Sequence, residues 1–182
     1  VILIVIVLVA FARDASSAAI GSVVEQQGVT SVERQGEESN LEQGSEVEFM
    51  DTVKTGKGNL GITFIDDTNV AVSSQSSLII DDFVYDPENP TKGSMNANVL
   101  QGNFSFVSGQ IAKVGNDAMK VTTPVLTIGV RGTQVAGKAN QDGEDNEIVL
   151  LPNEDGSVGQ VLITNQSGSV LLTEAYQLTT IA

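Results

Sequence analysis

The sequence predicts an all-β fold, a sandwich or rolled β-structure of many short strands, and three observations favour it. Short apolar or alternating segments recur at a spacing of roughly ten residues. Clusters of glycine, asparagine and aspartate, which favour turns, separate them. No window of a dozen residues within 20–182 combines helical apolar spacing with capping residues. A β-solenoid fits the same periodicity, so these architectures stay open at this point.

Residues 1–12 form an apolar segment that ends at Arg13 and Asp14. The sequence begins without methionine, as expected of a chain that starts inside a longer one or after processing. The segment fits the apolar region of a secretion signal, part of a membrane anchor of about 20 residues, or a strand inserted into a neighbouring subunit. We expect an anchor or assembly segment, followed by a spacer at residues 13–19. Its apolar side chains are Val1, Ile2, Leu3, Ile4, Val5, Ile6, Val7, Leu8, Val9 and Phe11.

The β-domain is predicted to span residues 20–182. Its first half contains two predicted hairpins and a strand that ends at Asp86-Pro87. The residues from Glu88 to Met95 contain Pro90 and Gly93 and predict a loop. The hairpins are 21–25 with 29–33 around Gln26-Gln27-Gly28, and 60–64 with 70–72 around residues 66–69; the strand is 78–85.

The second half repeats the pattern. Phe104 and Phe106 are two residues apart in one strand and should share a face. Pro124 cannot donate a hydrogen bond to a β-ladder and should separate two strands. Residues 171–178 fit a short helix or a strand. The predicted strands are 99–107, 119–122, 125–130, 134–137, 147–151, 158–164 and 169–172, with turns at 108–110 and 152–156.

Composition excludes several classes of function. Lysine and arginine total 9 against 23 acidic residues, giving a net charge of −14, which disfavours binding to nucleic acid. Histidine and cysteine are absent, so imidazole- or thiol-based catalysis and metal ligation are excluded. Aromatic residues make up 4%, too few for extensive stacking on sugars or bases. We therefore expect a protein that is not an enzyme and that uses no metal and no cofactor.

The segment from Thr122 to Thr133 places one arginine between two glycines after an X-Pro break. The guanidinium of Arg131 has two interpretations: it holds a carboxylate of a partner, or it pins its own sheet to an internal carboxylate such as Asp81 or Asp82. We favour the internal pin. The residues that we select here, as structural or interface positions, are Thr123, Pro124, Gly129, Arg131, Gly132 and Thr133.

Several phrases together resemble the FecR-like domains of bacteria, all-β modules outside the cytoplasmic membrane. They are Ile20-Gly21-Ser22-Val23, Asp51 to Gly56, Ser77 to Tyr85, Leu100 to Gly109, and Thr123 to Thr133. The resemblance covers residues 20–138, and the chain after Gly137 is expected to be a C-terminal β extension, as in long variants fused to surface or secreted proteins. One departure is Asp67-Thr68, where the family commonly has glycine-serine.

The resemblance implies a location in the cell envelope, in the periplasm or on the surface, or anchored in the inner membrane. The function that we favour from the sequence is a non-catalytic structural subunit, attached through residues 1–12 to a neighbouring subunit or a membrane complex. The alternative is a membrane-anchored periplasmic module for signal relay or protein binding, similar to the FecR transducer. Both functions imply other protein subunits as partners, with membrane contact through residues 1–12 and no nucleic acid.

Overall fold

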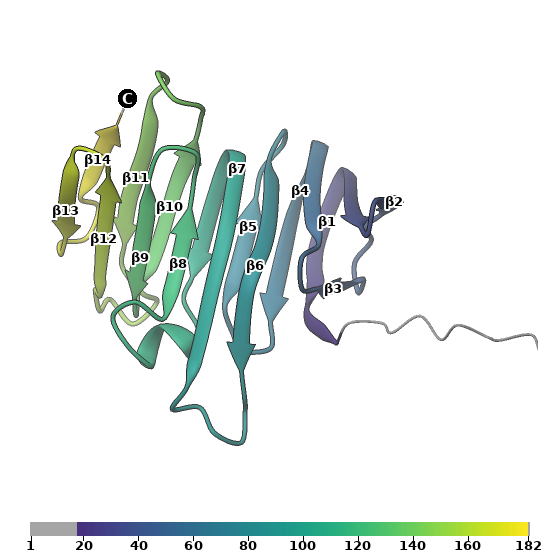
Figure 1. Ribbon diagram of the computed structural model, residues 1–182, viewed down its shortest axis with the longest axis horizontal. Coiled ribbons are helices and arrows are strands. Elements are labelled where there is room, and N and C mark those ends of the chain that lie inside the picture. The colour runs from purple at the N-terminus through teal and green to yellow at the C-terminus, as the bar shows by residue number, and fades with distance from the viewer. Residues whose placement is uncertain (1–17, 182) are drawn as a thin grey trace, which may run out of the picture.

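The computed structural model describes residues 18–181, so the apolar segment predicted at residues 1–12 lies outside the described residues. The described part is an all-β structure with one short 3₁₀ helix, as the sequence predicts (Figure 1). Its elements are β1 (Ala19–Arg34), β2 (Glu37–Asn40), β3 (Glu46–Glu48), β4 (Thr52–Phe64), β5 (Asn69–Val72), β6 (Ser77–Tyr85), β7 (Gly93–Val107), η1 (Ile111–Lys113), β8 (Met119–Thr122), β9 (Thr127–Arg131), β10 (Gln134–Ala139), β11 (Asn146–Leu151), β12 (Gln160–Asn165), β13 (Gly168–Leu172) and β14 (Leu178–Ile181).

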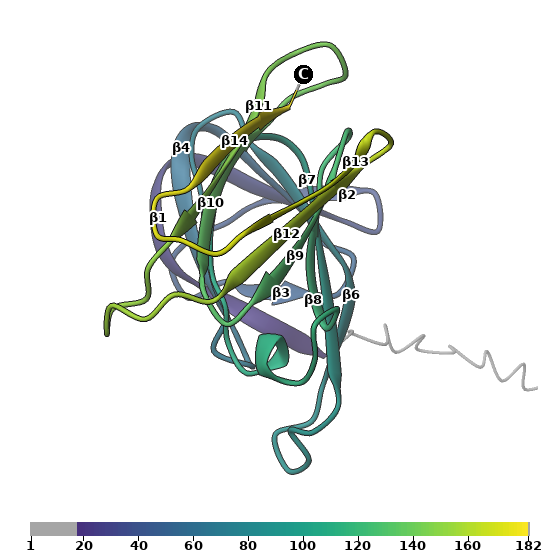
Figure 2. The ribbon, with the colours of Figure 1, turned by 90° about the vertical axis from the view of Figure 1, so that its left-hand side faces the viewer.

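The strands form one 14-stranded sheet that folds over into two layers. Figure 2 shows the layers face to face, viewed from the end that carries β13 and β14. One layer runs β2-β1-β4-β6-β7-β8-β9-β12-β13, and the other runs β3-β1-β4-β5-β7-β10-β11-β14. The architecture is therefore a rolled sandwich, and β1, β4 and β7 belong to both layers because each is long enough to bend from one into the other.

Glycine makes these bends feasible. Gly28 of β1 has a φ of +72°, and a Cβ there would lie 2.2 Å from the carbonyl oxygen of Lys57. Gly102 of β7 has a φ of +99°, and its Cβ would lie 2.1 Å from the side chain of Ser76. Both positions need a residue without a side chain, because the backbone is left-handed and another segment is in close approach.

The hairpin predicted around Gln26-Gln27-Gly28 is wrong. The segment is a single strand that pairs with β4 over most of its length, from Gly21 with Phe64 to Glu33 with Thr52. A glycine at positive φ fits a bulge inside a strand as well as a turn between two strands, and the register shift between Gly28 and Thr30 shows the bulge.

Most other predicted elements are confirmed, but the loop predicted from Glu88 to Met95 ends earlier, because β7 already begins at Gly93. β4 and β5 form the expected antiparallel hairpin, from Leu60 with Val72 to Thr63 with Asn69. Phe104 and Phe106 are both buried, with ring centroids 5.8 Å apart. Residues 171–178 contain no helix and include the end of β13 and a turn. The turn at 152–156 does not close a hairpin, because β11 pairs with β10 and β14 whereas β12 pairs with β9 and β13.

The core lies between the two layers and is continuous from β1 to β13. Burying each large apolar side chain there contributes about 1.5–3 kcal/mol to folding. The largest fully buried side chains are Phe64, Phe106, Leu60, Ile62, Leu78, Ile80, Met95, Ile111, Met119, Ile128, Ile148 and Leu150.

Candidate functional site

Arg131 lies at the end of β9, where its strand pairs with Gln160 of β12. Its Nε donates to the carbonyl oxygen of Asn116 at 3.2 Å, and its Nη1 donates to Oε1 of Gln160 at 3.3 Å. The predicted partners Asp81 and Asp82 are wrong: among the described residues Arg131 forms no ion pair, and Asp81 accepts from Asn96 instead. The arginine therefore links two chain segments through neutral acceptors.

The flanking residues of this motif shape the backbone. The hydroxyl of Thr123 accepts a hydrogen bond from the amide of Leu126 at 3.3 Å, and this bond closes the turn that contains Pro124. The hydroxyl of Thr133 is buried and donates to the carbonyl oxygen of Leu151 at 2.9 Å. Gly132 has a φ of +63°, which glycine adopts without strain.

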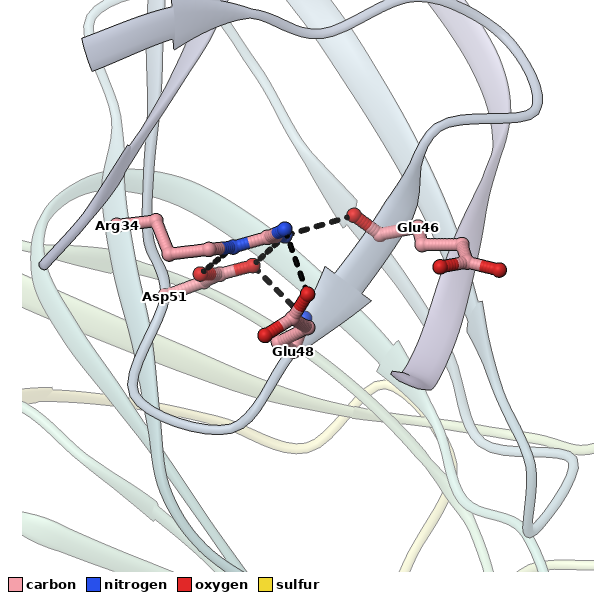
Figure 3. Close-up of polar contacts among 4 residues, drawn as sticks. All are labelled: Arg34, Glu46, Glu48 and Asp51. Carbon is pink, nitrogen blue, oxygen red and sulfur yellow. Dashed lines mark hydrogen bonds and ion pairs between the residues drawn. The ribbon is translucent and has the colours of Figure 1, made fainter. Parts of the chain in front are cut away.

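A second arginine, which the sequence analysis missed, forms the strongest ion-pair cluster in the described residues. Arg34 is bidentate to Asp51, with Nε–Oδ1 2.8 Å and Nη2–Oδ2 2.7 Å, and its Nη1 lies 2.7 Å from Oε1 of Glu48 (Figure 3). Nη2 also donates to the carbonyl oxygen of Glu46 at 3.1 Å. Asp51 in turn accepts from the amide of Glu48 at 2.7 Å, so one side chain holds the whole segment 46–51 against β1.

Because its carboxylates are buried, this cluster stabilises the fold and does not form a reactive site. The side chains of Asp51 and Glu48 are 1% and 7% exposed, whereas that of Arg34 is 35% exposed. The hydrogen bond to Asp51, followed by the charges of Asp51, Glu48 and Glu46, raises the pKa of Arg34 above its ordinary value. The guanidinium stays charged at every working pH and compensates two carboxylates that are removed from water.

A third polar cluster joins the β4–β5 turn to the segment before η1. The buried carboxylate of Asp66 accepts from the hydroxyl of Thr68 at 2.8 Å and from the amide of Ile111 at 3.2 Å. The Thr68 hydroxyl accepts from the amide of Gly109 at 3.0 Å, and a Cβ on Gly109 would lie 2.2 Å from the carbonyl oxygen of Asp66. Asp67 has a φ of +66°, a left-handed conformation that glycine, the residue expected there from the resemblance, adopts without strain.

The described residues contain no group of three or more acidic side chains placed to hold a metal ion. The charged groups of the clusters described above form hydrogen bonds or ion pairs with one another, so we look for the functional site on the surface. The candidate is a groove along the bend of the sandwich, which we call the corner groove. By this name we mean two pockets that share Gln75. One, of about 540 Å³, is lined by Gln27, Gly28, Lys57, Gly58, Asn59, Ser74 and Gln75. The other, of about 390 Å³, is lined by Lys54, Thr55, Gln75, Ser76, Ser77, Leu100 and Gln101.

The floor of the corner groove is built by close backbone approach. A Cβ on Gly58 would lie 2.3 Å from the carbonyl oxygen of Gln27, so β1 and β4 meet there without side chains between them. Gln75, which both pockets share, accepts a hydrogen bond from the side chain of Gln101 through its carbonyl oxygen at 3.1 Å. The sequence shows the glycines, but not that Gly28 and Gly58 face one another.

The corner groove combines amide side chains with one unpaired cation and an apolar rim. Lys54 is paired with Glu33 at 2.6 Å, and that hydrogen bond raises the pKa of the lysine. Lys57 forms no ion pair with any described residue. Leu100 lines the second pocket and is 39% exposed. Val29 lines neither pocket, but it follows Gly28, its side chain lies beside Gly56, and it is 66% exposed. Such a surface fits a polypeptide better than a small apolar ligand.

Comparison with protein families shows to which family the chain belongs. The family model described as "FecR protein" matches residues 51–158. The chain belongs to the FecR family. The match includes the Asp66 cluster and the Arg131 motif, and it extends past Gly137, at which the resemblance in the sequence was expected to end. It begins at Asp51, the residue that accepts the bidentate bond from Arg34.

A solved structure shows a similar fold. It is a crystal structure described as that of a "putative anti-sigma factor" from Parabacteroides distasonis, with a TM-score of 0.51 and 12% identity. The match covers 71% of this chain and 58% of that one, so the chain spans little more than half the length of the protein it resembles. No curated protein matches the sequence.

In the described residues, no helix has the length and apolar character needed to cross a membrane.

Proposed function

We propose that this chain is a non-catalytic protein-binding module of the bacterial cell envelope that relays a signal, the alternative function in the sequence analysis. The observation that carries the proposal is the FecR family match over residues 51–158. The similarity to a structure described as an anti-sigma factor supports a regulatory role in preference to the structural subunit favoured from the sequence alone.

The corner groove is the surface that we assign to partner binding. Its proposed occupant is an extended segment of another protein that carries a carboxylate next to apolar side chains. Lys57 offers the cation, and the amides of Gln27 and Asn59 offer hydrogen bonds to a peptide backbone. Leu100 in the second pocket, and the exposed Val29 next to Gly28 at the edge of the groove, offer apolar contacts. In a chain of net charge −14, a local cation attracts an acidic segment only at short range, which makes the contact selective.

Site-specific photocrosslinking in the bacterium that encodes the chain tests this assignment. A photoreactive phenylalanine analogue in place of Val29 should give one discrete adduct on irradiation. The adduct should be lost when Lys57→Glu is added, because the substitution places a like charge opposite the bound carboxylate. The same analogue at Val84, a comparably exposed strand position that does not line the groove, is the matched control.

An adduct that is equally abundant from Val29 and Val84, or that survives Lys57→Glu, overturns the groove as the binding surface. Signal relay makes a separate prediction: Lys57→Glu should change the transcription of a defined gene set while the abundance of the chain stays constant. Loss of the adduct without a transcriptional change would leave a binding module that is not a relay.

A further inference from the structure

The two ends of the sandwich expose edge strands of very different chemistry. Within residues 18–181, β13 and β14, one from each layer, are paired on one side only, with β12 and β11 respectively. Their sequences, Gly-Ser-Val-Leu-Leu and Leu-Thr-Thr-Ile, contain no charged residue. A free edge normally carries charge, proline or a bulge that prevents it from pairing with another chain. This pair of edges carries none of these.

The same end exposes apolar side chains. Val170, Leu171 and Leu178 are 39%, 42% and 56% exposed. Between the two edges lies a pocket of about 310 Å³ that is lined by apolar residues and by small or polar ones: Ile163, Val170 and Ile181, with Asn165, Ser167, Gly168, Ser169 and Thr179. The open end therefore offers edge-strand backbone groups and exposed apolar side chains together, as a strand-pairing interface does. Figure 2 looks onto this end, with β13 and β14 nearest the viewer.

We infer that this end, the β13–β14 face, is a self-association surface at which two copies of the chain pair about a two-fold axis. Charge argues for a second copy. Two chains of net charge −14 repel one another, so they approach closely only where neither surface is charged, and these edge strands provide such a surface. Symmetry fits as well, because an antiparallel ladder between two copies of one edge strand is two-fold symmetric.

Head-to-tail stacking is the less favourable arrangement. It would place the opposite end, where β2 and β3 carry Glu37, Glu38 and Glu46, against the uncharged edges. Those carboxylates would lose water without gaining a cation, because β13 and β14 contain no lysine or arginine. The inference goes beyond the proposed function, since the face does not overlap the corner groove.

Single-cysteine crosslinking tests the inference cleanly because the chain contains no cysteine. The full chain, kept in a mild detergent for its apolar residues 1–12, receives Leu178→Cys, Thr179→Cys or Thr180→Cys in turn. At least one variant should form a disulfide-linked dimer under mild oxidation, at least tenfold faster than Val84→Cys. Val84 is 57% exposed and so matches Leu178 in access.

Two further measurements test whether the uncharged edge strands are the cause of dimer formation. Raising the salt from about 50 mM to about 500 mM should increase the dimer yield, because salt screens the repulsion between the two acidic chains. Adding Val170→Lys to the crosslinking variant should reduce the dimer several-fold, whereas Val84→Lys should not, and neither exposed substitution should shift the thermal unfolding midpoint by more than a few degrees.

Equal crosslinking rates at β14 and at Val84 overturn the inference. A disulfide between a copy that carries only Leu178→Cys and a copy that carries only Glu38→Cys, when the two variants are mixed, would also overturn it, since only head-to-tail contact joins those two positions. Crosslinking that falls as salt rises would also overturn it, since attraction between opposite charges, and not contact between uncharged edges, would then hold the two copies together.

Discussion

At one end of the sandwich, β2 and β3 carry three exposed glutamates, and Arg34 fastens the segment beside them to β1. At the other end, β13 and β14 carry no charge at all. The end with β2 and β3 also exposes Phe49 and Met50. These two residues lie in a turn and not along a strand edge, and the amide of Met50 donates to the carbonyl oxygen of Ile80. One edge is thus protected from pairing with other chains, whereas the other is left available.

The two arginines sharpen this comparison. Arg34 neutralises two carboxylates that are almost completely buried, while Arg131 contacts one carbonyl and one amide oxygen near the surface. The sequence draws attention to Arg131 because it stands between glycines. The structure shows that the energetically important arginine is the other one, because the cost of an unpaired charge depends on burial and not on the local sequence.

The largest expected effect is that of Arg34→Met. The substitution keeps the apolar stem but leaves Asp51 and Glu48 buried without a cation, which should lower the free energy of unfolding by about 3 kcal/mol. Urea denaturation at neutral pH measures the loss. Lys54→Met, which breaks the exposed pair with Glu33, is the control and should cost far less, because solvent screens that pair. Equal losses in the two variants would contradict the structural role of burial.

An intermediate effect is expected for Arg131→Met. Two hydrogen bonds to neutral acceptors near the surface should contribute about 1 kcal/mol together. The variant should therefore still fold, and it should unfold at a slightly lower urea concentration. A loss as large as that of Arg34→Met would show that Arg131 is the main internal pin. A folded variant that no longer binds a partner would make Arg131 an interface residue.

The smallest effect concerns the hairpin that closes the protected end. Gln35 and Gly36 link β1 to β2 with φ values of +54° and +85°, the geometry of a type I′ turn. Asparagine adopts this conformation more readily than glutamine, so Gln35→Asn should raise the free energy of unfolding by about 0.5 kcal/mol. Thermal unfolding checks this, and a lowered midpoint would show that the glutamine makes a contact worth more than the strain.

Much of the fold could be predicted from the sequence, because alternation and turn residues act locally. The β4–β5 hairpin and the break at Pro124 follow from neighbouring residues alone. The continuous strand through Gly28 could not be predicted, since its positive φ serves a bulge whose partner lies on β4. A turn at 152–156 is visible in the sequence, but not that it carries the chain from one layer to the other.

The candidate site was less predictable for the same reason. Arg34 meets Asp51 across 17 residues of chain, and the two pockets of the corner groove draw on β1, β4, the β5–β6 turn and β7. Composition does predict that chemistry based on histidine or cysteine is excluded, because that conclusion needs no geometry. The surfaces depend on the register between distant strands, and no local pattern encodes that register.

Hydrogen–deuterium exchange, followed residue by residue at two protein concentrations, tests the difference between the two ends most directly. As the concentration rises, amides of β14 should gain at least tenfold protection, while those of β2 keep their exchange rates, since only the uncharged edge pairs with another copy. Exchange at β14 that is independent of concentration, or protection that appears at β2 instead, would contradict the account.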